Sequence, residues 1–425
     1  MKIISRAICC CLLFTAPLLG QGRRLWVLRA PGEMVEYDPA TFAVKQTVKV
    51  PTGAVESPQN VSVNRAGQIL FAPPVSLPLS DEETASAHKL WFWNGRAATM
   101  IDQGVQREVT ATGSNQAVRE TAPTAYLAAD GGHLFWFANQ SRRLQREDID
   151  LSVATTWQSW RTDTGGRGRE DLTASKLPDC RCPTGSCEES CPLGEVWVPE
   201  SGVDKFFMMT QVVAGKGEQV AKASMLYQEE AGKWKATVLA EPLQRLLDAA
   251  SSGNVIVKAI PDTSCCGWSN QSDDQTLVLA NGKTIPVFDE LATYKNPDYD
   301  VSFYTSRARL SPDLGYIAMT IESTAQANKP IQLAEQGQAS LEEAKQIRKA
   351  VAELPAVEVK SMEVKSMEDS PKRVAFLPHA TLVGWINDKE ILIVEGHVLV
   401  AYHVGTGERR KSSVRVEDAG MVFLR

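Results

Sequence analysis

The chain has 425 residues, of which 45 are lysine or arginine and 51 are aspartate or glutamate, giving a formal net charge of −6. A mildly acidic protein has no general attraction to nucleic acid or to an anionic membrane surface, so neither is expected as a partner. This length fits two or three ordinary domains or one large repeat architecture.

Residues 1–21 are typical of a cleaved signal peptide. Lys2 and Arg6 supply positive charge, and residues 7–19 form an uncharged apolar run. That run is shorter than the about 20 apolar residues that a transmembrane helix needs, and a charged start before a short apolar core is the pattern of a secretory signal. We therefore expect residues 22–425 to be exported to the periplasm or out of the cell.

Short β-rich segments follow, separated by turn residues. Three strands are expected between Arg23 and Pro51, with turns at Pro31-Gly32 and at residues 38–41. Asn64–Gly67 and Asn94-Gly95 mark the turns of the next hairpins. Six or seven such groups recur at a spacing of about 40–55 residues, which is the range of propeller blades. The sequence thus predicts an all-β fold, a six- or seven-bladed β-propeller forming one domain.

Cysteines gather in one excursion from this pattern, at residues 162–195, where "CRCPTGSCEESCP" follows a polar, glycine-rich approach. Six cysteines remain after the signal peptide, and an even number in an exported chain favours disulfides. The spacing lacks the two C-x-x-C pairs of a structural zinc site. The residues expected in disulfides are Cys180, Cys182, Cys187, Cys191, Cys265 and Cys266, with their pairing left open.

The adjacent pair Cys265-Cys266 allows two interpretations. A bond between the two would form a strained ring, and here the chain resembles quinone-dependent alcohol dehydrogenases, propellers that carry such a pair in the cofactor pocket. Alternatively, each cysteine reaches back to the 180–191 loop, which would tie two long excursions together. The second interpretation is preferred because it uses every thiol.

One segment carries a pattern known from other repeat proteins. "SPDLGYIAMT" (Ser311–Thr320) resembles the S-P-D-G-x-x-I-A-F strand pair of TolB-like propeller repeats, with Leu314-Gly315 where that pattern has glycine and then a charged residue. Residues 32–51 and 397–412 resemble the outer strands of YVTN-like propeller blades. The resemblance implies a propeller architecture, and it implies no particular activity because this fold hosts many unrelated ones.

Residues 328–373 are expected to form a helical and charged insertion within a blade. The segment Ser340–Leu354 has apolar residues at helical spacing, and Ser340 with Glu343 makes a capping box. The following stretch "VEVKSMEVKSMEDSPKR" contains "VKSME" twice in tandem. We expect the helix to dock on the ring and the charged stretch to be solvated.

The two ends of the domain are expected to meet. The segment Met421–Leu424 is one isolated strand, and the first blade lacks a strand. Pairing of Met421–Leu424 with Leu25–Leu28 would close the ring and remove an unpaired sheet edge, which would otherwise be prone to aggregation.

No catalytic signature is present: the chain has no H-E-x-x-H, G-x-S-x-G, Walker loop or G-x-G-x-x-G. The sequence therefore predicts a binding or scaffold protein that recognises a protein, peptide or glycan at one propeller mouth, without a cofactor or metal ligands. The alternative is a propeller enzyme, either a calcium-dependent lactonase-like hydrolase or a quinone-dependent dehydrogenase-like protein. Candidate residues for a ligand site or the channel are His379, Trp268, Asp273 and Asp274.

Overall fold

The structure is a computed structural model. It describes residues 23–29, 32–50, 61–71, 74–78, 83–110, 116–120, 124–127, 132–146, 149–176, 196–197, 206–214, 220–230, 233–239, 245–249, 255–260, 274–279, 284–286, 303–323, 329–337, 340–362 and 371–425. All nine cysteines lie outside these residues, so the predicted disulfides stay predictions.

Within the described residues the strands form six antiparallel sheets, five of which have four strands. The first, in the order β3-β2-β1-β30, contains β1 (Leu25–Arg29), β2 (Glu33–Tyr37), β3 (Val44–Lys49) and β30 (Val422–Leu424). The second contains ten strands: β4 (Val61–Val63), β5 (Ile69–Phe71), β6 (Pro74–Pro78), β7 (Glu83–Trp93), β8 (Ala98–Thr110), β9 (Gln116–Glu120), β10 (Thr124–Leu127), β11 (His133–Arg146), β12 (Ile149–Asp163) and β13 (Glu170–Lys176).

The other four sheets keep the order of the chain. The third contains β14 (Val196–Trp197), β15 (Phe206–Ala214), β16 (Val220–Glu230) and β17 (Lys233–Leu239). The fourth contains β18 (Arg245–Ala249), β19 (Val255–Ile260), β20 (Asp274–Leu279) and β21 (Thr284–Pro286). The fifth contains β22 (Phe303–Leu310), β23 (Tyr316–Ser323), β24 (Ala356–Ser361) and β25 (Lys372–Pro378). The sixth contains β26 (Ala380–Trp385), β27 (Glu390–Glu395), β28 (Val398–His403) and β29 (Arg409–Arg415).

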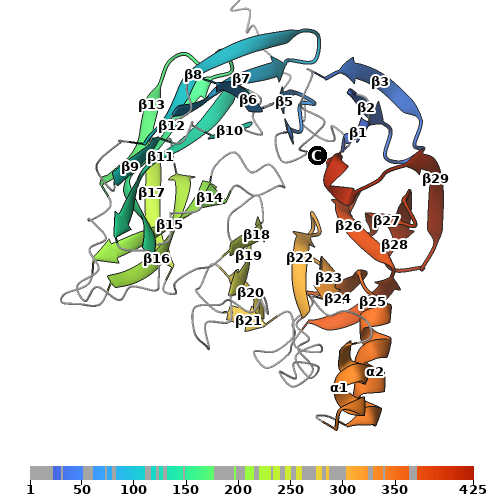
Figure 1. The fold of residues 1–425 in the computed structure, drawn as a ribbon. Helices are drawn as coiled ribbons and strands as arrows, with labels where there is room; N and C mark the ends of the chain where they lie inside the picture. The colour runs from blue at the N-terminus through green and yellow to red at the C-terminus, as the bar shows by residue number, and fades with distance from the viewer. Residues whose placement is uncertain are drawn as a thin grey trace, which may run out of the picture.

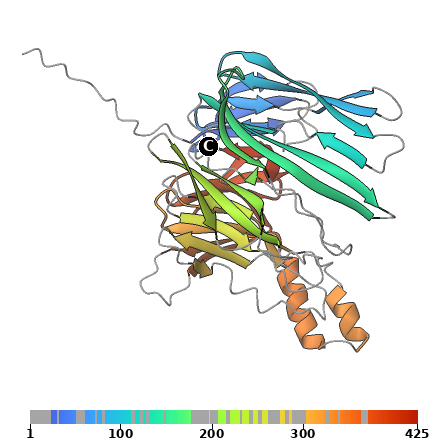
Figure 2. The ribbon, with the colours of Figure 1, turned by 90° about the vertical axis from the view of Figure 1, so that its left-hand side faces the viewer.

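The sheets surround a common centre, as blades do in a β-propeller (Figure 1). Strands β18, β22 and β26 lie nearest that centre, and β21, β25 and β29 lie at the outside (Figure 1). The long strands of the ten-stranded sheet, drawn in teal and green, occupy one side of the molecule (Figure 2). The predicted all-β propeller architecture is therefore confirmed.

Apolar side chains on both faces of the strands hold neighbouring sheets together. In β1, Leu25 and Val27 pack against the β26–β29 sheet, whereas Trp26 and Leu28 pack against β4, β5 and β7. Successive side chains of a strand point to opposite faces, so an uninterrupted apolar run fits a strand that is buried on both sides. All four of these side chains are buried, which explains why β1 has no polar face.

The predicted ring closure is confirmed. Strand β30 pairs antiparallel with β1, in a register that sets Leu424 opposite Leu25 and Val422 opposite Val27. The pairing continues by one residue, since the backbone N–H groups of Arg24 and Arg425 each donate to the other's carbonyl at 2.6 and 2.9 Å. One sheet thus joins the two ends of the described chain.

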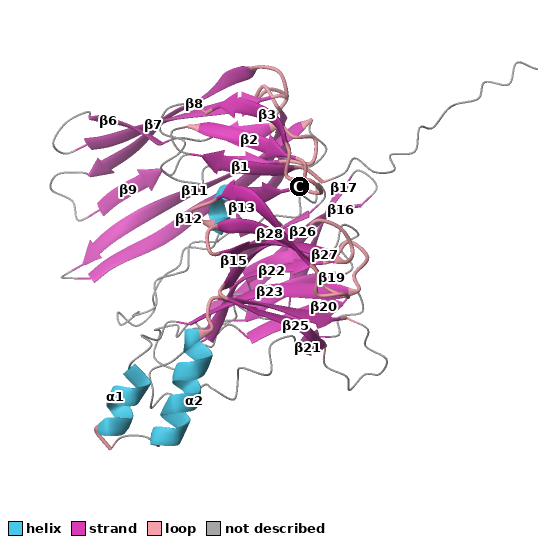
Figure 3. Cartoon of the chain, turned by 90° about the vertical axis from the view of Figure 1, so that its right-hand side faces the viewer, coloured by secondary structure: helices cyan, strands magenta, loops and turns pink. Residues whose placement is uncertain are grey.

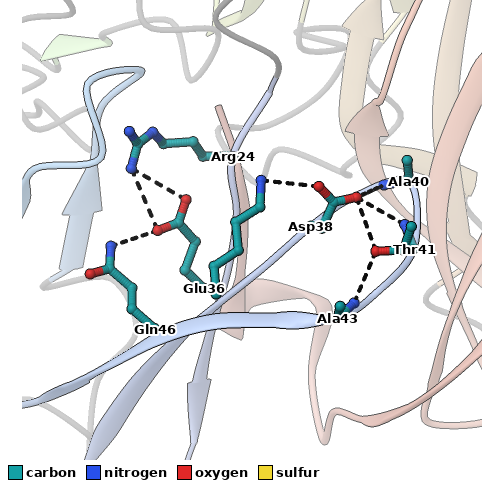
Figure 4. A network of polar contacts seen from close by, with 8 residues as sticks. Arg24, Glu36, Asp38, Ala40, Thr41, Ala43 and Gln46 are labelled. Atoms are coloured by element: carbon teal, nitrogen blue, oxygen red, sulfur yellow. Dashed lines mark hydrogen bonds and ion pairs between the residues drawn. The ribbon is translucent and has the colours of Figure 1, made fainter.

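The first sheet also holds two polar contacts that fix its outer strands (Figure 4). In the predicted 38–41 turn, Asp38 Oδ1 accepts hydrogen bonds from the backbone N–H groups of Ala40 and Thr41 at 2.9 and 3.0 Å. Glu36 is buried and accepts from Arg24 Nη1 at 3.3 Å and from Gln46 Nε2 at 2.6 Å. The charge of Arg24 is therefore compensated inside its own sheet.

The TolB-like segment forms the turn at residues 311–315 and most of β23, which pairs with the preceding strand β22. Ser311 Oγ donates to Asp313 Oδ1 at 2.6 Å, and the same oxygen accepts from Gly315 N at 2.9 Å. Leu314 has a φ of 59°, in the left-handed region that favours glycine. This backbone geometry explains why the family pattern has glycine at that position.

Residues 328–373, predicted to be an insertion within a blade, include two helices and also one strand of a sheet. Helices α1 (Lys329–Glu335) and α2 (Leu341–Ala352) lie between β23 and β24, contact each other and project as a pair away from the sheets (Figure 3). The expected docking of the helix on the ring is therefore wrong. The expected solvated stretch is wrong over its first residues, because residues 356–361 form β24, in the middle of a sheet, and its first five residues are buried. Residues 363–370 of that stretch lie outside the described residues. Similarly, Glu170–Lys176, expected in the approach to the cysteine loop, form β13.

Replacing Ser340 with alanine is expected to destabilise the helical pair alone. Ser340 is the N-cap of α2, and its hydroxyl accepts the N–H of Glu343 at 3.5 Å, as the capping box predicts. Losing such a cap costs about 1 kcal/mol of helix stability. Hydrogen exchange should therefore speed up about fivefold in α2 and stay unchanged in β24, and equal acceleration in both would contradict the prediction.

Candidate functional site

The inner strands of neighbouring sheets run in the same direction. Arg307 on β22 donates to the carbonyl of Leu382 on β26 at 3.0 Å, and two residues further along β22 the carbonyl of Arg309 accepts from Trp385 Nε1 at 2.9 Å. On the other side of β22, Arg309 donates to Leu247 O on β18 at 3.1 Å. These strands therefore end on the same side of the ring, which we call the carboxyl-end rim.

Five arginines from different elements lie at or just below the carboxyl-end rim, where they affect one another electrostatically. Two lie on β22, one precedes β1, one follows β30 and one lies in the turn after β4. They are Arg307, Arg309, Arg23, Arg425 and Arg65. Closure of the ring is what brings Arg23 and Arg425 together, because the start of β1 lies beside the end of β30.

Three of these arginines connect their own sheet to a neighbouring one. Arg307 and Arg309 reach from β22 to carbonyl groups on β26 and β18, and Arg425 Nε donates to Val63 O at the end of β4 at 2.8 Å. A carbonyl oxygen satisfies a donor without cancelling its charge. The rim therefore gains hydrogen bonds between sheets while it keeps its positive charge.

Burial and neighbouring positive charges make the protonated form of three of these arginines less favourable. Burial, and after it the charge of Arg425, lowers the pKa of Arg309 to about 9. Burial together with neighbouring arginines lowers the pKa values of Arg23 and Arg425 to about 10. All three side chains still carry their proton at neutral pH, so the electrostatic cost is borne by the folded protein.

Carboxylates offset part of this charge. Asp248 on β18 is buried, and its Oδ2 accepts the backbone N–H of Leu310 at 2.7 Å. The negative charge of Asp248 partly counteracts the lowering of the pKa values of Arg23 and Arg425. The charge of Asp388, which lies in the exposed turn after β26, does the same for Arg23. Arg307 experiences Asp418 and Glu322 instead. Asp248 therefore acts on both Arg23 and Arg425, and Asp388 acts on Arg23.

Arg23 differs from its neighbour Arg24 in its contacts. The guanidinium of Arg24 is paired with Glu36, whereas that of Arg23 makes no hydrogen bond or ion pair with the part of the chain that the structure describes. The turn that carries Arg65 packs close by, since a Cβ at Gly67 would collide with the guanidinium of Arg24. Gly67 also has a φ of 77°, which requires glycine.

The residues proposed from the sequence lie elsewhere. His379 occupies the one-residue connection between β25 and β26, exposed and with a φ of 54°, so it lies at the opposite rim, where the inner strands begin. Asp274 starts β20, the third strand of its sheet counted from β18. Trp268 and Asp273 lie outside the described residues. The structure therefore does not bring His379 to the arginines.

Sequence reasoning missed the arginine rim because its members are scattered. The signals were the R-x-R pattern of β22, the Arg23-Arg24 pair before the first strand, and Arg65 in a predicted turn. None of these is unusual alone, since a surface role is the ordinary interpretation of an arginine. Only their shared position at or just below the carboxyl-end rim distinguishes them.

The described residues contain neither a metal-binding cluster nor a helix that could span a membrane. No group of three or more histidine, cysteine, aspartate or glutamate side chains among them is placed to hold a metal ion. Within the same residues, no helix has both the length and the apolar character that crossing a membrane requires. The predicted absence of a cofactor and the possible calcium site stay predictions.

The arrangement of the sheets defines a β-propeller that is closed by the pairing of β1 with β30. No family model and no curated protein matches the chain. Among solved structures the chain is similar to TolB from Acinetobacter baumannii, with 10% identity, a TM-score of 0.35 and coverage of 92% of this chain and 79% of that one. It is also similar to apo AztD from Citrobacter koseri, with 10% identity, a TM-score of 0.38 and coverage of 93% and 95%.

An acylaminoacyl peptidase in complex with Z-Gly-Gly-Phe-chloromethyl ketone is similar as well, with 11% identity and a TM-score of 0.42. The similarity covers 89% of this chain and 47% of the peptidase, so the chain spans about half of that protein. The resemblance to TolB-like propellers that the sequence predicted is thus found among solved structures.

Proposed function

We propose that this protein is an exported β-propeller that binds a protein or peptide partner at its carboxyl-end rim. One observation carries the proposal: five arginines gather at one rim of a chain whose formal net charge is −6. A cluster of one sign on a surface of the other sign steers a complementary partner and selects its orientation.

The chemistry of the rim favours binding over catalysis. A guanidinium keeps its proton throughout the neutral range, so it cannot exchange one as a general acid or base at that pH. It can hold an anionic group with directed hydrogen bonds. Asp248 is buried and accepts a backbone N–H, which supports a role in balancing charge.

A protein or peptide fits better than a glycan. Sugars stack on exposed aromatic rings, whereas four tryptophans of the described residues pack in the core. Trp26 and Trp93 meet edge to face at 5.8 Å, and Trp136 stacks on Trp160 at 6.1 Å, with all four buried between sheets. These rings stabilise the blades and offer no stacking surface.

We place the blade number at seven. The ten-stranded sheet divides into a β4-β5-β7-β8 part and a β10-β11-β12-β13 part, connected through β9. The two parts bury a shared apolar layer that includes Leu70 and Phe92 from one and Leu134 and Trp136 from the other. Two sheets that pack face to face are two blades, and β9 joins their edges.

Photocrosslinking from the rim tests the proposed function. Ala66, exposed in the turn beside Arg65, is replaced by a photoreactive benzophenone amino acid, and His379 receives the same group as the matched control at the opposite rim. After irradiation in the native host, a discrete adduct from position 66 and none from position 379 is expected. An adduct from position 379 alone, or from neither position, would contradict the proposal.

A further inference from the structure

We infer that the carboxyl-end rim recognises an acidic peptide segment, whose carboxylates are bound by the guanidinium groups of Arg23, Arg65 and Arg425. This inference rests on the proposed function and names the chemical class of the partner. Arg307 and Arg309 form the charged base of the site, since they are tied to carbonyl groups of the neighbouring sheets.

The arginines are spread over the rim, which favours an extended ligand. Arg309 contacts β18, Arg425 contacts β4, and Arg23 precedes β1, so the charges belong to several neighbouring sheets of the ring. The backbones of packed sheets lie about 10 Å apart, so the elements that carry these arginines are set out along the rim. A chain that carries several carboxylates can reach them one after another.

Donor capacity remains at the rim. A guanidinium has five N–H donors, and Arg425 directs its Nε to Val63 O and its Nη1 to Leu424 O. The half-buried guanidinium of Arg23 makes no hydrogen bond or ion pair within the described residues. A half-buried charged donor of this kind is stabilised by a ligand that supplies an acceptor with negative charge.

Carboxylates also suit the charge pattern better than a chain of phosphates. A carboxylate and a phosphate each accept two parallel hydrogen bonds from one guanidinium, so the preference comes from the groups around the arginines. Asp388, exposed in the turn after β26, lies close enough to Arg23 to raise its pKa. Its carboxylate repels anionic groups of either kind, but it can accept a backbone N–H of a peptide, and a polyphosphate has no such donor. Bound carboxylates would also reduce the mutual repulsion of Arg23, Arg65 and Arg425.

Fluorescence anisotropy with synthetic peptides tests the inference. The probe is a fluorescein-labelled peptide of alternating aspartate and glycine, and the control peptide has asparagine in place of aspartate. The wild-type protein should bind the aspartate peptide and not the asparagine peptide. Losing one charged hydrogen-bonding partner costs about 1.5–3 kcal/mol, so Arg23→Gln and Arg65→Gln should each weaken binding by about tenfold to a hundredfold.

A matched variant controls for the loss of a surface charge. Arg96 is exposed in the Asn94–Ala97 turn of another hairpin, much as Arg65 is exposed in the Asn64–Gly67 turn. Arg96→Gln should leave the affinity for the aspartate peptide unchanged, and none of the three variants should shift the thermal unfolding midpoint. Equal loss of binding in Arg96→Gln would overturn the inference, since it would show nonspecific attraction.

Further outcomes separate this inference from the proposed function. If inorganic polyphosphate binds and the aspartate peptide does not, the rim is an anion site of another class and the inference is wrong. If the crosslink from position 66 forms but neither probe binds, the partner is not acidic and the proposed function stands. If both the crosslink and the peptide binding are absent, both proposals fail.

Discussion

Replacing Glu358 with glutamine is expected to lower the free energy of unfolding by about 3–5 kcal/mol. Glu358 on β24 is 1% exposed, it is paired with Arg373 Nε, and its carboxylate lies 3.9 Å from the Nζ of Lys360, which is 0% exposed. The amide would keep the shape of the side chain and remove its charge. The ammonium group of Lys360 would then remain buried without the carboxylate beside it, which is the costly arrangement.

A volume-matched apolar pair provides the control for this prediction. The double variant Glu358→Leu, Lys360→Met removes both charges from β24 and should be as stable as the wild type or more so, because an apolar pair needs no desolvation of charge. Arg373 is partly exposed and can turn to solvent. Urea unfolding followed by tryptophan fluorescence measures all three proteins. A Glu358→Gln protein as stable as the wild type would show that the pair carries no such charge coupling.

Replacing Leu424 with alanine is the second large effect, at about 2–5 kcal/mol. Leu424 is 5% exposed, pairs with Leu25 in the register of β30, and contributes to the apolar layer that β1 shares with the β26–β29 sheet. Its side chain also packs 3.5 Å from the position of a Cβ on Gly384. The cavity left behind would weaken the strand pair that closes the ring.

Leu341→Ala is the matched control for this closure prediction, because Leu341 is a leucine that is 49% exposed, on α2. The control should cost well under about 1 kcal/mol, the usual result at surface positions. Leu424→Ala should also scatter light at a lower temperature, because a freed β1 edge can pair with other chains. Equal stability losses in the two variants would mean that β30 does not hold the ring closed.

The sequence was sufficient to predict the parts of the fold that follow from apolar alternation. Strand β30 and the first four residues of β1 are apolar, and β1 has one free edge at the place where the isolated strand β30 can complete its sheet, so the closure could be predicted. The turn at residues 38–41 could be predicted as well, because an aspartate oxygen satisfies the backbone N–H groups there.

Strand β24 was not predictable on the same basis. Glu358 and Lys360 alternate with buried valines, and charged residues in a strand ordinarily indicate a solvated face. Their burial depends on Arg373, which comes from the neighbouring strand β25. A charge that is neutralised by a residue distant in sequence cannot be recognised from local pattern, and the tandem "VKSME" copies reinforced the wrong interpretation.

The arginine rim was missed for a related reason. Arg65, Arg309 and Arg425 stand in three unrelated local contexts, a turn, a strand and the residue after a strand. Each lies at or just after the carboxyl end of the innermost strand of its sheet. Which strand is innermost can be seen only when the sheets are arranged around the ring. Sequence reasoning instead favoured His379, because it leads a strand and could line the channel, but that strand begins at the other rim.

Pairing of β1 with β30 makes recognition conditional on complete folding. In a folding intermediate whose ring is still open, Arg23 and Arg425 belong to separate, mobile chain ends, so the binding surface is not yet assembled. A partner that needs both arginines would then bind the closed ring and would not bind the open ring. By mass action, the same partner would stabilise closure by RT ln(1 + [L]/Kd), so occupancy and the integrity of the ring would be thermodynamically linked.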